Sequence, residues 1–439
     1  MQQRATGGAQ PTVDQDAFPG AHTISQRPMT AFFSWTPLGV ILLTSAMVSP
    51  MLVTVYGIDR TAVLALQYFI WAIATYLILT AVPRRDPRFA KMPSRMSRFF
   101  FLFLVAFSLS TVAVWINGNR SDLNAMLAQS AALLFMALPF FAMERASRTV
   151  RIDRAVLWTC HITLGLGLYS ILGDFLGLAH FESFGGRYFG SLGDSIAWAL
   201  TLPLIVYFST GRMPLAALAG VGLALTASRA PVLISVGALI LLMFFSRGRR
   251  FHYAAMILAL SIVGLFQGEL YTTLADRFAT TTFTSNDRTT TAALGIKIFL
   301  QSPLFGSGYN SLTHFYPTSA HRMSLGILPS QTSTAVQMLS DGGVITFLAY
   351  FCFVVAATIA GIGLMRNSQR QAEGGLINGI AAWLLAMLWL NQSALWFVVG
   401  SYVGPLVLGM AGVIAGSRTR FQSAQALAAP PRRSRPALG

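Results

Sequence analysis

Long apolar segments recur along nearly the whole chain, and they restrict its possible folds more than any single motif does. The hydrocarbon core of a bilayer is about 30 Å thick, so a membrane-spanning helix needs roughly 20 apolar residues. Segments of suitable composition lie near residues 35–56, 62–82, 99–116, 122–143, 154–173, 191–209, 214–228, 231–246, 252–268, 343–364, 376–393 and 396–416. Because a helix satisfies its own backbone hydrogen bonds inside the membrane, these segments predict an all-α polytopic membrane helix bundle with about twelve transmembrane helices.

Composition supports the same class of protein. Hydrophobic residues make up 54% of the 439 residues and charged residues only 10%, whereas about a quarter of the residues in soluble domains are charged. In a soluble domain the formal net charge of +16 would indicate a nucleic-acid partner. Here Lys and Arg cluster in short connections between apolar segments, where they set membrane orientation, so we expect no nucleic acid.

Neither cysteine predicts a disulfide or a metal framework. Cys160 and Cys352 both fall inside apolar segments, where a lone thiol usually behaves as a small buried side chain. Residues 1–30 are polar and lack the apolar core and cleavage site of a secretory signal. We therefore expect a disordered cytoplasmic tail at 1–30, a single transmembrane domain at 31–416, and a disordered basic cytoplasmic tail at 417–439.

The positions of the basic residues predict an orientation. If the N-terminus is cytoplasmic, most of the 31 Lys and Arg residues fall on the cytoplasmic side, including those in the connections 84–98 and 246–250. The positive-inside rule predicts such an asymmetry. Both termini would then be cytoplasmic, and the large polar connection at about 269–342, between the ninth and tenth predicted segments, would lie outside.

Three arginines on the predicted outer side suggest a binding site. Arg187 precedes one apolar segment, Arg229 opens another, and Arg288 begins the central stretch of the large connection. A guanidinium group suits bidentate contact with phosphate and stays charged in a poorly hydrated site. We interpret the three as a site for a diphosphate near the outer membrane surface. Alternatively, each contacts lipid headgroups or pairs with a nearby acid such as Asp194 or Asp287.

The stretch after Arg288 predicts an amphipathic helix over residues 289–301, followed by a tight turn at the sequence PLFGSGYN. The Gly-x-Gly of this turn lacks the preceding strand and following helix of a nucleotide-binding loop. The helix could lie along the membrane surface or pack on the bundle.

Several stretches carry a family resemblance. They are GGRYFGSLGDSIAWALTLPL, LTASRAPVLISVGALILL, DRTTTAALGIKIFLQSPLFGSGYNSL and QMLSDGGVITFLAYF, which together span about residues 185–365. They resemble an Arg-x-x-Gly turn, a Ser-Arg-Gly motif, a Pro-Leu-x-Gly-x-Gly turn and a helix ending in an acid and Gly. These are motifs of the O-antigen ligase and polymerase superfamily of bacterial surface-glycan assembly.

The resemblance implies glycosyl transfer from a polyprenyl-diphosphate-linked oligosaccharide to an acceptor hydroxyl at the periplasmic face of the bacterial inner membrane. The large outer connection would then be a periplasmic loop. No acid pair or metal-ligand spacing is recognisable in the sequence, so we expect a metal-independent reaction with no cofactor. Expected partners are the lipid-linked oligosaccharide, membrane lipid and other polysaccharide export or assembly proteins.

One departure affects the catalytic group. Many members carry a His-Asn pair where this chain, aligned on Gln337, has Thr332 and Ser333. The remaining candidates for a general base on the correct side are His321, His314, Asp194 and Asp341. The loop histidines could instead be solvated surface residues, Asp194 could pair with Arg187, and Asp341 could merely end a helix. Tyr309 and Tyr316 are candidates for stacking on sugar rings.

We predict a polymerase that joins lipid-linked repeat units into exopolysaccharide or O-antigen chains, because the missing His-Asn pair weakens a ligase interpretation. An O-antigen ligase, which transfers glycan to lipid A core, is the alternative. A secondary transporter is a distant third, since charged residues are almost absent from the middle of the apolar segments and no internal repeat is recognisable. A structural partner in a glycan export complex would not need the outer arginines.

Overall fold

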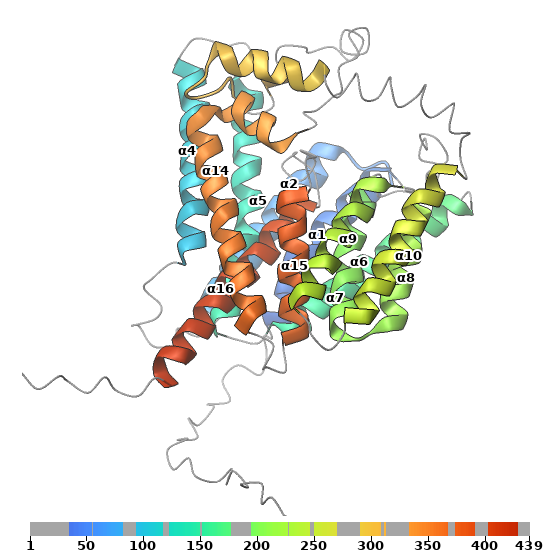
Figure 1. The fold of residues 1–439 in the computed structure, drawn as a ribbon. Coiled ribbons are helices and arrows are strands. Elements are labelled where there is room, and N and C mark those ends of the chain that lie inside the picture. Colours follow the sequence, from blue (N-terminus) through green and yellow to red (C-terminus); the bar gives the residue numbers. More distant parts are fainter. Residues whose placement is uncertain are drawn as a thin grey trace, which may run out of the picture. The chain divides into compact units, whose positions relative to one another are not determined.

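Helices account for nearly all of the part of the chain that the structure describes. The structure is a computed structural model, and it describes residues 35–54, 56–81, 94–116, 123–149, 152–176, 195–226, 228–245, 250–269, 290–308, 311–312, 333–367, 374–390 and 403–428. Within these ranges the chain forms helices joined by turns, and no strand is present (Figure 1). The predicted all-α fold is confirmed for this part of the chain.

Each predicted apolar segment overlaps one described helix. In chain order these are α1 (Trp35–Thr54), α2 (Arg60–Ala81), α4 (Arg95–Ile116), α5 (Leu123–Thr149), α6 (Asp153–Phe175), α7 (Ser195–Thr210), α8 (Met213–Leu225), α9 (Arg229–Phe245), α10 (Arg250–Glu269), α14 (Thr334–Asn367), α15 (Gly374–Leu390) and α16 (Val403–Ala428). Residues 290–301, inside the predicted outer connection, form a further helix. This confirms the predicted amphipathic helix at 289–301 to within one residue.

Within the described residues, length and composition together mark five helices as clear membrane spans. Helices α1, α2, α4, α6 and α14 are long and apolar enough to cross a membrane, by length and composition alone. Helices α7, α8, α9 and α15 are apolar but shorter. Helix α8, for example, has 13 residues and extends only about 20 Å, against a hydrocarbon core of about 30 Å. The apolar helices indicate a multi-pass membrane protein, and the number of about twelve spans stays a prediction.

Two helix boundaries differ most from prediction. Helix α14 begins at Thr334, before the predicted start at 343, because a kink joins a short helical segment to the apolar one. Helix α16 continues to Ala428, so residues up to 428 are helical where we predicted a disordered tail from 417. The extension contains Ala, Gln and Arg, which favour helix once a helix has started. The predicted tail at 1–30 lies outside the described residues.

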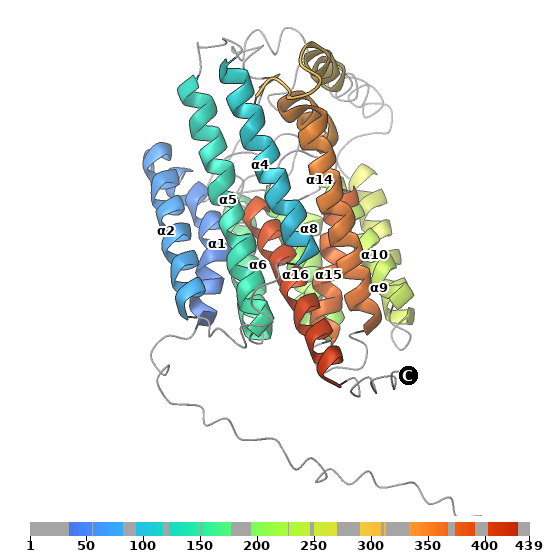
Figure 2. The same cartoon turned by 90° about the vertical axis from the view of Figure 1, so that its left-hand side faces the viewer.

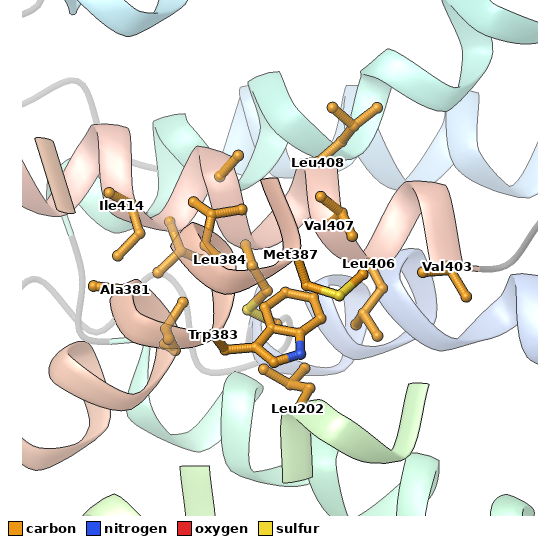
Figure 3. Packing of buried hydrophobic residues seen from close by; sticks show 14 of the residues in the cluster. Leu202, Ala381, Trp383, Leu384, Met387, Val403, Leu406, Val407, Leu408 and Ile414 are labelled. Atoms are coloured by element: carbon orange, nitrogen blue, oxygen red, sulfur yellow. The ribbon is translucent and has the colours of Figure 1, made fainter. Parts of the chain in front are cut away.

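The interior of the bundle is built on α7 and α15, which are buried on nearly every side. The indole nitrogen of Trp383 in α15 donates to the hydroxyl of Thr201 in α7 at 2.7 Å. Around this indole lie Leu202, Met387 and Leu406 (Figure 3). A helix that is buried on all sides needs no polar stripe, and therefore both helices are almost uniformly apolar.

Helices α5 and α16 pack at backbone distance through glycines of α16. A Cβ atom on Gly412 would collide with the carbonyl oxygen of Phe140, and one on Gly416 would collide with the carbonyl oxygen of Glu144. Small residues allow such close approach between membrane helices. The buried carboxylate of Glu144 accepts hydrogen bonds from Ser97 of α4 and from Arg148 of its own helix. A buried charge is stable only with such partners, so this group ties α4 to α5.

Candidate functional site

A tight turn follows the helix at 290–301. The backbone N–H of Ser302 donates to the carbonyl of Phe299 at 3.0 Å, and the N–H of Gly306 donates to that of Ser302 at 2.8 Å. Gly306 and Gly308 then take positive φ angles of 71° and 90°, which L-residues with a side chain rarely adopt. The predicted tight turn at PLFGSG is therefore confirmed.

This turn is bonded to a kink in α14. At Gly343 the backbone leaves helical geometry, with φ 69° and ψ −174°. The N–H groups that this break exposes find partners in the turn: Val344 donates to the carbonyl of Pro303 at 2.9 Å and Ile345 to that of Leu304 at 3.5 Å. A helix start leaves such N–H groups without intrahelical partners. The turn therefore caps the second half of α14.

Bonds in the opposite direction complete the junction. The N–H of Ser307 donates to the carbonyl of Ser340 at 2.8 Å, and the N–H of Gly308 donates to that of Asp341 at 2.9 Å. These carbonyls belong to the helical segment that ends at the kink. Turn and kink thus satisfy each other's backbone groups, and we call residues 302–308 and 340–345 together the turn–kink junction.

The carboxylate of Asp341 fixes the chain just beyond the turn. Asp341 is buried, and its Oδ1 accepts from the backbone N–H of Ser311 at 3.0 Å and from the Ser311 hydroxyl at 2.7 Å. The hydroxyl of Ser340 donates to the same oxygen at 3.3 Å. One oxygen of Asp341 thus accepts all three bonds, two of them from Ser311. Asp341 therefore holds Ser311 against the start of α14.

Helix α4 supports the junction from the side. The hydroxyl of Ser110 donates to the carbonyl of Phe305 in the turn and lies 3.0 Å from the carbonyl of Asp341 at the kink. Helices α4 and α14 run side by side, as both views show (Figure 2). A side chain from a third part of the chain thus contacts both halves of the junction.

Ser333, one of the two positions where the family pattern departs, lies directly before α14. Ser333 precedes the helix, and its hydroxyl oxygen accepts from the N–H of Val336 at 3.5 Å. The side chain of Gln337 is buried, and its Oε1 has no hydrogen-bond partner among the described residues. A buried amide oxygen without a partner is costly, so Gln337 is a candidate to bind a polar group of a substrate.

Only part of the predicted site lies in the described residues. Asp341 has its side chain described, and Arg229 is described as the first residue of α9 without its side chain. The other predicted site residues lie outside the described ranges: Arg187, Asp194, Arg288, Tyr309, His314, Tyr316 and His321. The structure therefore does not test their convergence. Among the described residues, no group of three or more His, Cys, Asp or Glu side chains lies together in a way that could hold a metal.

Sequence reasoning missed three polar residues of the region. Ser110 is embedded in an apolar segment and carries no signal. Ser311 lies in the quoted stretch GYNSL, and Gln337 served only to align the family pattern. For Ser311 and Gln337, their position inside the family-like stretches was the one signal that the sequence offered.

A second polar cluster joins α6 to the last turns of α7 and to the connection between α7 and α8. The Tyr207 hydroxyl lies 2.6 Å from Nδ1 of His161, and a guanidinium nitrogen of Arg212 lies 3.4 Å from its Nε2. Because guanidinium only donates, the contact with Arg212 suits the tautomer of His161 in which Nε2 accepts and Nδ1 carries the proton that faces Tyr207. No predicted site residue belongs to this cluster.

The fold and the junction define a multi-pass membrane protein with a built polar structure at one end of α14. Residues 214–351 match the model of a protein family described as O-antigen ligase. The predicted resemblance to the O-antigen ligase and polymerase superfamily is thereby confirmed over these residues. A comparison with curated proteins found no match.

The matched residues include the turn–kink junction, Asp341, Arg229 and Arg288. They do not include Arg187 and the stretch GGRYFGSLGDS, although we expected the resemblance to begin near 185. The match supports ligase-type or polymerase-type activity in general, acting on a lipid-linked oligosaccharide.

Removing the Asp341 carboxylate is expected to destabilise the junction. Asp341→Ala leaves both donors of Ser311 unpaired in a buried site, which typically costs about 1–3 kcal/mol. Ser311→Ala removes only the hydroxyl and should cost about 1 kcal/mol. The measurement is thermal unfolding of the purified variants in detergent. The double variant should unfold close to Asp341→Ala, because the two changes remove the same bond; additive losses would show that the carboxylate does not hold Ser311.

Proposed function

We propose that this protein is a polymerase that joins polyprenyl-diphosphate-linked oligosaccharide repeat units at the periplasmic face of the inner membrane. The observation that carries the proposal is the turn–kink junction. It is built from two stretches that resemble superfamily motifs, it lies within the residues that match the O-antigen ligase family, and it closes one end of the apolar half of α14. A polar structure at the end of an apolar membrane helix suits a substrate that has both a membrane-bound carrier and a water-soluble glycan.

The proposed reaction forms one bond and breaks one. An acceptor hydroxyl attacks the anomeric carbon of the donor sugar, the bond from that carbon to the diphosphate oxygen breaks, and the hydroxyl proton passes to a base. The leaving polyprenyl diphosphate takes the electron pair, so catalysis requires cationic groups at the diphosphate and correct placement of the acceptor. We assign Arg288 and Arg187, then Arg229, to the diphosphate, with no metal.

For the base, the local geometry favours residues other than Asp341. Its buried carboxylate already accepts from Ser311, so we assign it a positioning role at the junction. His321, His314 and Asp194 remain the proposed bases. Tyr309 and Tyr316 are proposed to stack on the sugars of the growing chain.

An O-antigen ligase remains the second candidate, because the matched family is described as O-antigen ligase. Both activities use the same class of donor and differ in the acceptor, which is another lipid-linked glycan or lipid A core. We favour the polymerase because Thr332 and Ser333 stand where the His-Asn pair of many members lies.

Glycan size and attachment in a deletion strain distinguish the candidates. We expect deletion to leave single repeat units on the lipid carrier, and complementation with the wild-type chain to restore long chains on gels that resolve the two. Long chains that accumulate on the carrier without reaching lipid A core would identify a ligase. Normal glycan in the deletion strain would contradict both activities.

A further inference from the structure

The helix at 290–301 presents three different faces at 3.6 residues per turn. Thr291, Gly295 and Ile298 are buried and form the face toward the rest of the protein, with Leu312 against Ile298. Ile296 and Leu300 lie on the opposite side, with 47% and 67% of their side chains exposed.

The third face lies between those two and is polar. Thr290, Lys297 and Gln301 form it, and all three are exposed. A helix exposed to water on its whole outer surface would place polar residues there. This helix instead shows two large apolar residues beside a narrow polar stripe, the pattern of helices that lie in a membrane interface.

The junction fixes the helix at one membrane boundary. The apolar half of α14, residues 344–367, extends about 36 Å at 1.5 Å per residue, enough to cross a hydrocarbon core of about 30 Å. Its first residues, Val344 and Ile345, are hydrogen-bonded to Pro303 and Leu304, which directly follow the helix. The C-terminal end of the helix therefore lies where α14 enters the membrane.

The exposed apolar surface of the helix continues onto α14. Leu304 in the turn is 60% exposed, and its carbonyl accepts from Ile345, which is 41% exposed on a clear membrane span. Leu348, one turn further along α14, is 53% exposed. The exposed apolar residues of α14 are therefore followed by Leu304 at the junction, four residues beyond Leu300 in the chain.

The direction of the helix agrees with this placement. It is the gold helix above α14, seen from the side in Figure 1 and nearly end-on in Figure 2, and it lies crosswise to α4 and α14 in both views. A helix crosswise to a membrane span lies in the plane of the bilayer.

We propose that the helix at 290–301 is an interfacial helix. Its residues Ile296 and Leu300, together with Leu304 of the following turn, insert among lipid acyl chains. Lys297 then lies at the level of the lipid phosphates. One consequence rests on the proposed function: the diphosphate of a lipid-linked donor lies at the same headgroup depth as Lys297.

Nitroxide accessibility in vesicles tests the insertion. The full chain with Cys160→Ala and Cys352→Ala receives one new cysteine, Leu300→Cys or Ile296→Cys, is spin-labelled, and is reconstituted into phosphatidylethanolamine–phosphatidylglycerol vesicles. Gln301→Cys, on the polar face of the same helix, is the matched control, and Leu348→Cys is the reference for a lipid-facing site. Monodisperse elution of each variant establishes that it is folded.

At positions 296 and 300 we expect the label to respond more to oxygen, which partitions into lipid, than to a water-soluble nickel chelate, as at 348. At position 301 we expect the reverse. Equal nickel access at 296, 300 and 301 would place the helix in water, and low access to both reagents at 296 and 300 would place another protein surface there; either overturns the proposal. The measurement needs no glycan substrate, so a failure of the proposed polymerase function leaves its outcome unchanged.

Discussion

Replacing Gly306 with alanine is expected to disrupt the turn–kink junction and to be among the most destabilising single changes in the chain. The new Cβ would lie 2.5 Å from the backbone of Asp341 and Gly342, and the residue would have to keep a φ of 71°. A positive φ costs a residue with a side chain about 1–2 kcal/mol, and overpacking against a rigid neighbour about 1–3 kcal/mol more. Gly343→Ala should behave in the same way, since its Cβ would collide with Leu304. Thermal unfolding in detergent, together with the yield of monodisperse protein, measures the loss.

Two other glycines separate the effect of a positive φ angle from the effect of a steric collision. Gly57 also has a positive φ of 65°, but a Cβ there would meet nothing within 4 Å, so Gly57→Ala should lose only about 1–2 kcal/mol. Gly165 lies inside α6 with open space around it, and Gly165→Ala should be neutral or gain about 0.5–1 kcal/mol. If Gly306→Ala unfolds at the same temperature as Gly57→Ala, the backbone of the turn is not in close contact with the kink in α14. That result would contradict the turn–kink junction.

The helices could be predicted from the sequence because a membrane-spanning helix is recognised by one property, a long run of apolar residues. An apolar run of sufficient length has few alternatives to a helix in a bilayer, so each predicted segment overlaps a described helix. The prediction placed the start of α14 too late because the glycines Gly342 and Gly343 directly precede the apolar run, and glycine is typical of a helix end. The positive φ of Gly343 interrupts the helix without ending it, and only the bonds from the turn make that interruption stable.

The candidate site was less accessible to sequence reasoning because its bonds join distant parts of the chain. The Ser110 hydroxyl and the Phe305 carbonyl are 195 residues apart, and nothing in the apolar α4 sequence distinguishes Ser110 from other small polar residues. Asp341 was predicted by its residue type and side of the membrane. Its burial and its bonds to Ser311 point to a positioning role, a distinction that a one-dimensional pattern does not contain.

Replacing Arg288 with alanine is expected to reduce chain assembly by on the order of a hundredfold to a thousandfold, the usual effect of removing one charge-stabilising donor from a transition state. The reason is that negative charge develops on the diphosphate as the sugar–phosphate bond breaks. Arg187→Ala should have a comparable effect if that arginine shares the site. Arg288→Lys should restore activity only in part, because ammonium keeps the charge but loses the planar pair of donors. Glycan chain length in the complemented deletion strain, normalised to the amount of protein in the membrane, gives the measurement.

The control for this prediction is Arg60→Ala. Arg60 is the first residue of α2 and is far from the motifs in sequence. It lies between the first two apolar segments, and a cytoplasmic N-terminus would place that connection on the outer side. If the outer arginines act only by contacting lipid headgroups, all three alanine variants should assemble chains equally well. If only Arg288→Ala loses chain assembly, the diphosphate site is retained but Arg187 is not part of it. Arg187 lies outside the residues that match the O-antigen ligase family. Wild-type chain length in both Arg288→Ala and Arg187→Ala would instead show that groups other than these arginines bind the diphosphate. The role of the turn–kink junction would then not be to position these arginines.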